Sequence, residues 1–178
     1  MSPEQINQLF DEVKQHLIKD YPFLQDWHFK IDNAKKRAGV CRVSKKIIGI
    51  SYNHLINNSE EIIKDTLLHE FAHAIAFQLH GEATHGMFWK TIAKKIGATP
   101  RASGHFNLPD APWKLVLSCF ETEKIEVIAP RYRINKRIKH FFLRGNISTK
   151  GKLYFLPSRQ VDDYLAGKLA FKELNFYQ

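Results

Sequence analysis

The chain has 178 residues, 44% of them hydrophobic and 25% charged, the balance of a soluble globular protein with one domain, or a core domain plus a small appendage. No stretch approaches the ~20 apolar residues of a membrane helix, and the N-terminus lacks the basic start and apolar core of a signal peptide. We therefore predict a cytoplasmic protein with no membrane partner. The two cysteines, Cys41 and Cys119, exclude a disulfide framework and an all-cysteine zinc site.

The net charge of +9 is unevenly placed along the chain. Residues 1–107 carry 14 Lys/Arg against 11 Asp/Glu, whereas residues 108–178 carry 13 against 7. A basic C-terminal part favours a polyanionic partner such as nucleic acid, which would associate the protein with the nucleoid. The alternative is a solvated basic face that serves solubility alone.

The N-terminal residues predict a helix that begins with a capping box. Ser2 is suited to cap this helix, Pro3 to its first turn, and Gln5 holds the capping-box position. Apolar residues follow at helical spacing, namely Ile6, Leu9, Phe10, Val13 and Leu17. Tyr21-Pro22 ends the helix.

Three short runs after this helix predict a small antiparallel sheet. Trp27, Phe29 and Ile31 alternate with polar residues, as in a strand, and residues 40–43 and 45–51 form two further strand-like runs.

Two more helices are expected next. Asn58 and Glu61 suit a capping box at the start of the first of them, which we expect to run to about His80 and to end at Gly81. The second is expected to begin near residues 85–86 and to end at Gly97.

A stretch rich in proline and glycine, residues 97–112, predicts a domain boundary. We expect a first domain over residues 1–107 and a basic, β-rich subdomain over residues 108–178. The second part contains strand-like runs and a last helix, at residues 113–120, 124–129, 139–143, 152–157 and 158–169. The chain is thus predicted to be α+β.

The segment His69-Glu70-Phe71-Ala72-His73 matches the pattern H-E-x-x-H. Histidines four positions apart on a helix lie one turn apart, about 6 Å along the axis, so both imidazoles can reach one zinc ion. Glu70 can then take a proton from the water that the metal activates. The alternative is a metal-free helix with ordinary hydrogen-bonded histidines, but burying Glu70 and His69 without a partner would be costly.

A catalytic zinc takes three protein ligands and keeps one open position, and three residues are candidates for the third ligand. His80 shares the helix face, but seven residues past His73 is about 10 Å of helix rise, too far for the same ion. His85 follows the break at Gly81, where the chain can fold back toward the metal. Glu82 is the alternative.

Two segments give the chain a resemblance to a known family. Residues 65–74, DTLLHEFAHA, and residues 85–89, HGMFW, resemble the SprT family of zinc metalloproteases, which includes bacterial SprT and eukaryotic Spartan. The resemblance covers residues 1–107 and implies a zincin-like, helical metalloprotease core that cleaves protein substrates with one catalytic Zn²⁺. It implies zinc ligands and a catalytic glutamate, namely His69, His73, His85 and Glu70. We assign Trp89 to core packing.

The second part of the chain departs from the family pattern. Family members often end in a zinc ribbon with two cysteine pairs, whereas residues 108–178 contain only Cys119. Residues 146–156 stand where a relative would carry its second pair. We therefore expect a ribbon-like β subdomain that lacks zinc-knuckle cysteines and is held by apolar packing.

The resemblance further implies proteolysis of proteins bound or crosslinked to DNA. Independent support comes from residues 131–144, which contain six Lys/Arg, no acid and three aromatic residues, because cations pair with phosphates and aromatic rings stack on unpaired bases. The candidate contacts are Arg131, Arg133, Lys136, Arg137, Lys139 and Arg144, with Lys35, Lys36 and Arg37 as an extension. The alternative is an amphipathic strand whose Tyr132, Phe141 and Phe142 face the core.

Two functions from different classes are therefore open. The first is a zinc-dependent endopeptidase in which Glu70 is the general base. The second is a non-proteolytic nucleic-acid-binding factor with a structural or vestigial zinc site. The sequence indicates no oligomeric state for either.

Overall fold

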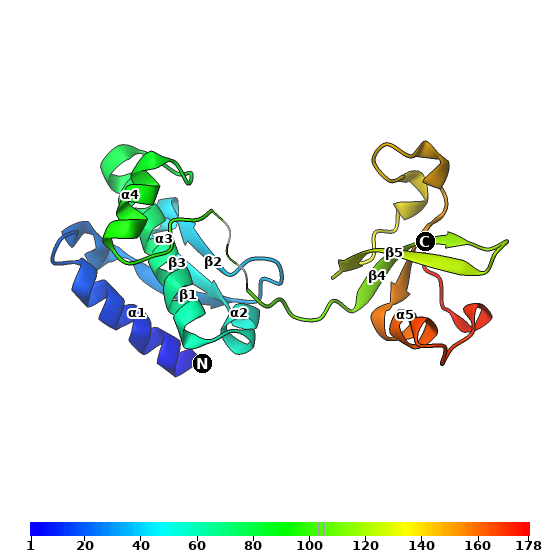
Figure 1. Cartoon of the computed structure of the whole chain (residues 1–178). Helices are drawn as coiled ribbons and strands as arrows, with labels where there is room; N and C mark the ends of the chain where they lie inside the picture. The colour runs from blue at the N-terminus through cyan, green and yellow to red at the C-terminus, as the bar shows by residue number, and fades with distance from the viewer. Residues whose placement is uncertain (103, 105) are drawn as a thin grey trace. The chain divides into compact units, whose positions relative to one another are not determined.

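The structure, a computed structural model of the whole chain, describes residues 1–102, 104 and 106–178. These residues form two compact units, Met1–Pro109 and Asp110–Gln178, both drawn in Figure 1. Each unit combines helical segments with a three-stranded sheet, so the predicted α+β class is confirmed. Among the described residues, no helix is long and apolar enough to cross a membrane.

The first helix, α1 (Pro3–Leu17), begins as predicted. The Ser2 hydroxyl accepts the Gln5 backbone N–H at 3.2 Å, and the Gln5 side chain accepts the Ser2 N–H at 2.7 Å. Its buried face consists of Ile6, Phe10, Val13 and Leu17. Phe10 stacks on Phe71 of α3 (Glu60–His80), with ring centroids 5.4 Å apart, so α1 packs directly against the helix that carries the H-E-x-x-H motif.

The sheet of the first unit is mixed, with strand order β1-β3-β2. Its strands are β1 (His28–Asp32), β2 (Gly39–Arg42) and β3 (Ile47–Ser51). β2 and β3 form an antiparallel hairpin around the short 3-10 helix η2 (Val43–Lys45), but β1 runs parallel to β3. The predicted antiparallel sheet is therefore wrong for this pair. Residues 48–51 of β3 are all buried, which suits the central position, and the shorter, more exposed β2 is left at an edge.

Helix α3 ends at Gly81, as predicted. Gly81 adopts a left-handed φ of 68° and donates its N–H to the Phe77 carbonyl at 2.8 Å. The N-cap is Ser59 and not the predicted Asn58. Asn58 instead accepts the Asn107 N–H at 2.8 Å and donates to the Asn107 carbonyl at 3.1 Å. The Asn58 side chain, predicted to cap α3, thus binds the backbone of Asn107, a residue distant in the sequence.

One hydrophobic cluster joins the helices and the sheet of this unit. It draws residues from α1, the 3-10 helix η1 (Pro22–Asp26), β3, α3 and α4 (Met87–Lys95). Its members include Phe10, Leu24, Ile48, Phe71 and Trp89. A smaller cluster joins α1, α2 (Tyr52–Asn57) and α3 through Ile6, Leu55 and Ile63. Both clusters include residues of α3, which holds its motif in place.

The sheet of the second unit is antiparallel, with strand order β5-β4-β6. Its strands are β4 (Trp113–Cys119), β5 (Lys124–Arg131) and β6 (Leu153–Pro157). Helix α5 (Ser158–Leu165) packs on one face, where Val161 clusters with Val116 and Leu156. The 3-10 helix η5 (Phe171–Glu173) contributes Phe171 to the same cluster.

Residues 139–143, predicted as a strand, do not form one. Two 3-10 helices, η3 (Ile138–His140) and η4 (Ile147–Thr149), stand between β5 and β6 in the chain. Ile138 is buried against Leu115 and Phe155 on the other face of the sheet, while Phe141 and Phe142 are 50% and 46% exposed. Leu143, at the end of this segment, packs against the same cluster, and its N–H donates to the Thr149 hydroxyl at 2.8 Å.

Candidate metal centre

Three histidines from two parts of the first unit converge on one point. His69 and His73 lie on α3, and His85 lies in the turn between α3 and α4. The Nε2 atom of His85 is 3.0 Å from Nε2 of His69 and 3.1 Å from Nε2 of His73. The candidate ligand atoms of all three lie within 4.8 Å of one another. The structure thus brings together the three histidines that the sequence analysis singled out.

The arrangement fits a tetrahedral zinc site. Nitrogen ligands about 2.0–2.1 Å from a tetrahedral zinc ion lie roughly 3.3 Å from each other, close to the two distances around His85. A neutral imidazole has one N–H donor and one lone-pair acceptor, so the Nε2 atom of His85 cannot satisfy both neighbouring Nε2 atoms at once. A divalent cation would accept the lone pairs of all three imidazoles at once.

The protonation state of the cluster also suits metal binding. Burial, together with the smaller effect of the neighbouring histidines, lowers the pKa of His69 and of His73 to about 4. The pKa of His85 is lowered by burial and by the charge of Lys90. All three imidazoles are therefore neutral at pH 7, and the neutral form is the one that binds a metal ion.

Glu70 stands beside the cluster and is only 7% exposed. In the metal-free chain, burial raises the pKa of Glu70 to about 8, against the opposing effects of the Arg37 charge and of a hydrogen bond from the Cys41 backbone. A cation at the three histidines would favour the carboxylate form. Gly39 on β2 leaves room for this side chain, because a Cβ there would lie 2.7 Å from Glu70 Oε1.

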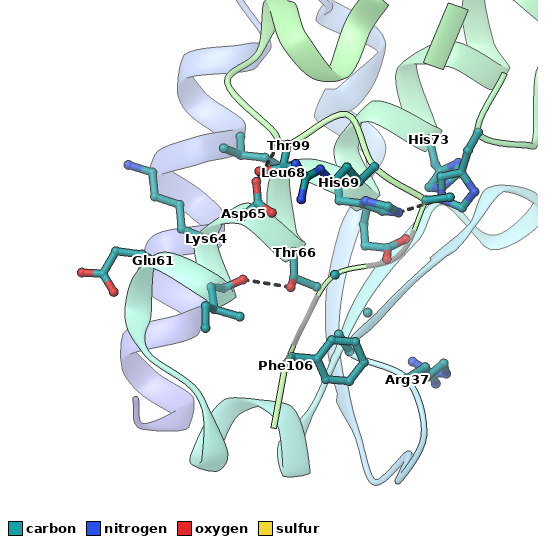
Figure 2. Close-up of a pocket in the computed structure, with 18 of the residues that line it drawn as sticks. Arg37, Glu61, Lys64, Asp65, Thr66, Leu68, His69, His73, Thr99 and Phe106 are labelled. Atoms are coloured by element: carbon teal, nitrogen blue, oxygen red, sulfur yellow. Dashed lines mark hydrogen bonds between the residues drawn. The ribbon is translucent and has the colours of Figure 1, made fainter. Parts of the chain in front are cut away.

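A cavity of ≈ 1120 Å³ opens onto these groups. Its walls come from the turn before β2, from α3 and from the segment after α4, and they include Arg37, Asp65 and Phe106 (Figure 2). Asp65 accepts the Thr99 N–H at 2.7 Å, which holds that last segment against α3. The edge strand β2 enters the same cavity through Gly39. An extended peptide therefore has both space and an outer strand of the sheet next to the candidate metal centre.

Trp89 of α4 forms the floor of the centre. Its side chain is fully buried, and its ring centroid lies 4.7 Å from that of His69, 5.3 Å from His73 and 4.5 Å from His85. Its indole N–H donates to the His69 carbonyl at 3.4 Å. Trp89 is therefore a packing residue, as the sequence predicted, and the groups that it packs against are the three imidazoles.

The other two ligand candidates lie elsewhere. His80 stacks on Phe88 with ring centroids 3.9 Å apart and is not part of the histidine cluster. Glu82 accepts the Trp89 backbone N–H at 2.7 Å, which makes it a helix cap and not a metal ligand. The sequence analysis missed this role. A signal was present, because Glu82 precedes by four residues the N-cap Gly86, which has no side chain to accept an N–H of the first turn of α4.

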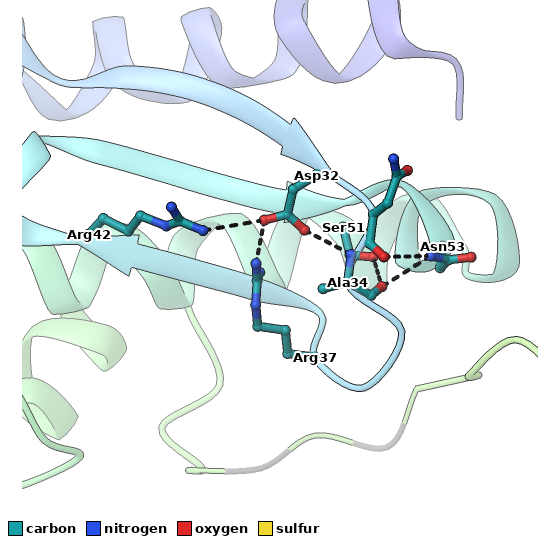
Figure 3. A network of polar contacts seen from close by, with 7 residues as sticks. Asp32, Ala34, Arg37, Arg42, Ser51 and Asn53 are labelled. Atoms are coloured by element: carbon teal, nitrogen blue, oxygen red, sulfur yellow. Dashed lines mark hydrogen bonds and ion pairs between the residues drawn. The ribbon is translucent and has the colours of Figure 1, made fainter. Parts of the chain in front are cut away.

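A polar network fixes the basic turn before β2. The Asp32 carboxylate binds the Arg37 guanidinium, lies 3.9 Å from that of Arg42, and accepts the Ala34 N–H at 3.0 Å. Ser51 and Asn53 both donate to the Ala34 carbonyl (Figure 3). Lys36 and Arg37 line the cavity, so this part of the predicted basic extension borders the metal centre.

The basic residues predicted to contact nucleic acid lie in the second unit. Arg131 ends β5 and is half-buried, whereas the other five candidates are exposed: Arg133, Lys136, Arg137, Lys139 and Arg144. Tyr132 is half-buried, but Phe141 and Phe142 are exposed. The alternative in which the aromatic residues all face the core is therefore wrong for the two phenylalanines.

Comparison with known proteins agrees with this geometry. The model of the SprT-like family matches residues 6–110, which include the whole histidine cluster and Glu70. The chain belongs to the SprT-like family. The resemblance drawn from the sequence is thereby confirmed, and the matched residues lie almost entirely in the first unit.

Several curated relatives carry the name Protein SprT. One from Pseudomonas fluorescens (strain Pf-5) is 29% identical over 103 residues, 55% of this chain and 62% of the relative. One from Actinobacillus succinogenes is 30% identical over 70 residues, 39% of this chain and 41% of the relative. One from Pseudomonas putida (strain GB-1) is 24% identical over 99 residues, 54% of this chain and 58% of the relative. The chain thus spans less than two thirds of these relatives, and no solved structure matches it significantly.

Proposed function

We propose that this SprT-like protein is a zinc-dependent endopeptidase with a zincin-like core in its first unit. The observation that carries the proposal is the convergence of three neutral imidazole nitrogens, from His69, His73 and His85, beside a buried carboxylate in an open cavity. The three histidines would hold one zinc ion, which supplies a Lewis acid that makes water nucleophilic near neutral pH.

The chain's own residues account for the rest of the reaction. Glu70 accepts the proton of the attacking water on a carboxylate oxygen and passes it to the leaving amine. The outer strand β2 pairs with an extended substrate by strand addition, which places a peptide bond at the cavity beside Glu70. Trp89 packs against all three imidazoles and, together with α3, holds them in a fixed arrangement while the substrate binds.

The proposed substrates are proteins bound or crosslinked to DNA. Support comes from the second unit, in which residues 127–161 carry nine Lys/Arg and no Asp/Glu. The exposed rings of Phe141 and Phe142 lie in the same stretch and are free to stack on unpaired bases. We propose that the two units correspond to the predicted protease domain and to a ribbon-like DNA-binding subdomain without a structural zinc, in a cytoplasmic, nucleoid-associated protein.

The second candidate function is a nucleic-acid-binding factor without proteolytic activity. The same exposed cations of the second unit favour it, because they need no chemistry at the histidines. The two functions differ in the effect of Glu70→Gln. In an endopeptidase this variant retains zinc and DNA but stops cutting a DNA-bound protein or itself. A wild-type protein whose cleavage matches that of the variant would leave only the binding factor.

A further inference from the structure

The turn that carries His85 is bounded by two glycines. Gly81 ends α3 in a left-handed conformation, and Gly86 is the N-cap of α4. Glycine loses more conformational freedom on folding than any other residue. A turn that contains two glycines is therefore costly to order. Other contacts must therefore hold His85 where the two α3 histidines meet it.

The Glu82 carboxylate makes such a contact. Its Oε2 accepts the Trp89 N–H at 2.7 Å, one of the groups that the first turn of a helix leaves without an intrahelical partner. Gly86 has no side chain with which to cap α4. A Cβ at Gly86 would lie only 1.8 Å from Glu82 Oε1, so the carboxylate fills the space that any other residue would occupy.

The same contact reaches the metal centre through Trp89. The Trp89 backbone is bonded to Glu82, while its ring packs against His69, His73 and His85. Glu82 therefore closes the 82–89 segment into a ring that contains His85 and rests on the floor of the site. The absence of a side chain at Gly86 is what lets this ring close.

We propose that Glu82 is a positioning residue that holds the His85 turn in its ligating conformation and so raises the affinity of the site for zinc. The inference rests on the proposed metal centre. Partners that orient a metal ligand typically contribute 10- to 100-fold to metal affinity. Glutamine at position 82 retains an oxygen that accepts the Trp89 N–H, whereas alanine retains none.

The test uses the full chain and two measurements. Zinc affinity is measured by competition with a chromophoric chelator, and exchange of the Trp89 amide hydrogen is followed in the zinc-free protein. We expect Glu82→Ala and Gly86→Ala each to weaken zinc binding by about 10- to 100-fold and to expose the Trp89 amide. Glu82→Gln should remain within a few-fold of wild type, and the double variant Glu82→Ala/Gly86→Ala should be no weaker than the weaker single variant.

A matched control lies in the second unit. Glu173 accepts the Ala170 N–H at 2.7 Å, the same kind of bond at the same length, so Glu173→Ala should leave zinc affinity unchanged. Wild-type affinity in both Glu82→Ala and Gly86→Ala would overturn the inference, and so would a Glu82→Gln variant as weak as Glu82→Ala. A wild-type chain that binds no zinc would instead refute the metal centre itself, while amide exchange would still report whether Glu82 orders the turn.

Discussion

In the first unit the candidate catalytic groups are gathered at one place: Glu70 is 7% exposed, and the ligand atoms of three half-buried histidines lie within 4.8 Å of one another. In the second unit five of the six candidate cations are exposed along irregular chain between β5 and β6. Bond making and breaking requires groups held in one geometry at low dielectric constant, whereas polyanion binding requires only charge density. If the proposed function holds, we therefore expect peptide cleavage and DNA binding to be separable in this protein.

The largest effect is expected from Glu70→Gln. Loss of the general base should lower the rate of peptide cleavage by about 10²–10⁴-fold, with zinc content and DNA affinity unchanged, as measured by a gel-based cleavage assay beside metal analysis and fluorescence anisotropy. Glu60→Gln, an exposed position at the start of the same helix, is the control. A Glu70→Gln variant that loses DNA binding as well would show that the units are not separable.

A smaller loss is expected from Gly39→Ala. A methyl group there would meet Glu70 Oε1 at 2.7 Å and Cγ at 2.8 Å, so the carboxylate must move. Displacement of a catalytic group by about 1 Å costs roughly 10²-fold in rate. Zinc affinity should be retained, since Gly39 approaches Glu70 and not the histidines. Unchanged cleavage by this variant would mean that the position of Glu70 is not critical.

The proposed role of the second unit in DNA binding is tested by removing charge. Replacing Arg133, Lys136 and Arg137 by glutamine should weaken DNA binding. The slope of log K against log [salt] should become shallower by about 0.9 for each lost phosphate contact, as measured by titration at several salt concentrations. The matched control removes Lys124, Lys168 and Lys172, which lowers the net charge equally outside residues 127–161. Peptide cleavage by the first variant should equal that of wild type on substrates without DNA. Equal losses of DNA affinity in both triple variants would mean that net charge alone, and not the position of these residues, determines DNA binding.

The smallest effect concerns acid stability of the first unit. Burial lowers the pKa of His54 from 6.5 to about 4, and its ring contacts Asn58 and Thr66. Between pH 6.5 and 4 the unfolded chain binds this proton and the folded chain does not, so the free energy of unfolding falls as pH falls. In zinc-free protein, His54→Gln should make the free energy of unfolding depend less steeply on pH. The loss of one titrating proton lowers that slope by at most about 1.4 kcal/mol per pH unit.

Denaturant unfolding at a series of pH values checks this slope. His16→Gln, an exposed position on α1, controls for the substitution itself. The same slope in wild type and His54→Gln would show that His54 is not held neutral by its surroundings.

Local signals in the sequence predicted the parts of the fold that local interactions decide. The capping box of α1, the end of α3 at Gly81 and the convergence of His69 with His73 follow from spacing and from backbone preferences within a few residues. The position of His85 could be predicted by the same reasoning, because the helix break at Gly81 lets the chain fold back toward His69 and His73.

Contacts between distant residues account for what the sequence did not predict. The Asn58 side chain pairs with Asn107, and β1 joins β3 from the far edge of the hairpin, which no local pattern specifies. Residues 139–143 have the composition of a strand, but they follow the 3-10 helix η3 and pack on the face of the sheet through Ile138 and Leu143. Glu82 was weighed only as a ligand, since its partner, the Trp89 N–H, is a backbone group present at every position.

The most direct measurement is the zinc content of the purified full chain, with His85→Ala beside it. We predict one zinc per chain in the wild-type protein and a loss of that zinc in the variant, because His85 is the only one of the three converging histidines outside α3. A wild-type chain with no zinc would contradict the metal centre, and two zinc ions per chain would contradict the view that the second unit holds none.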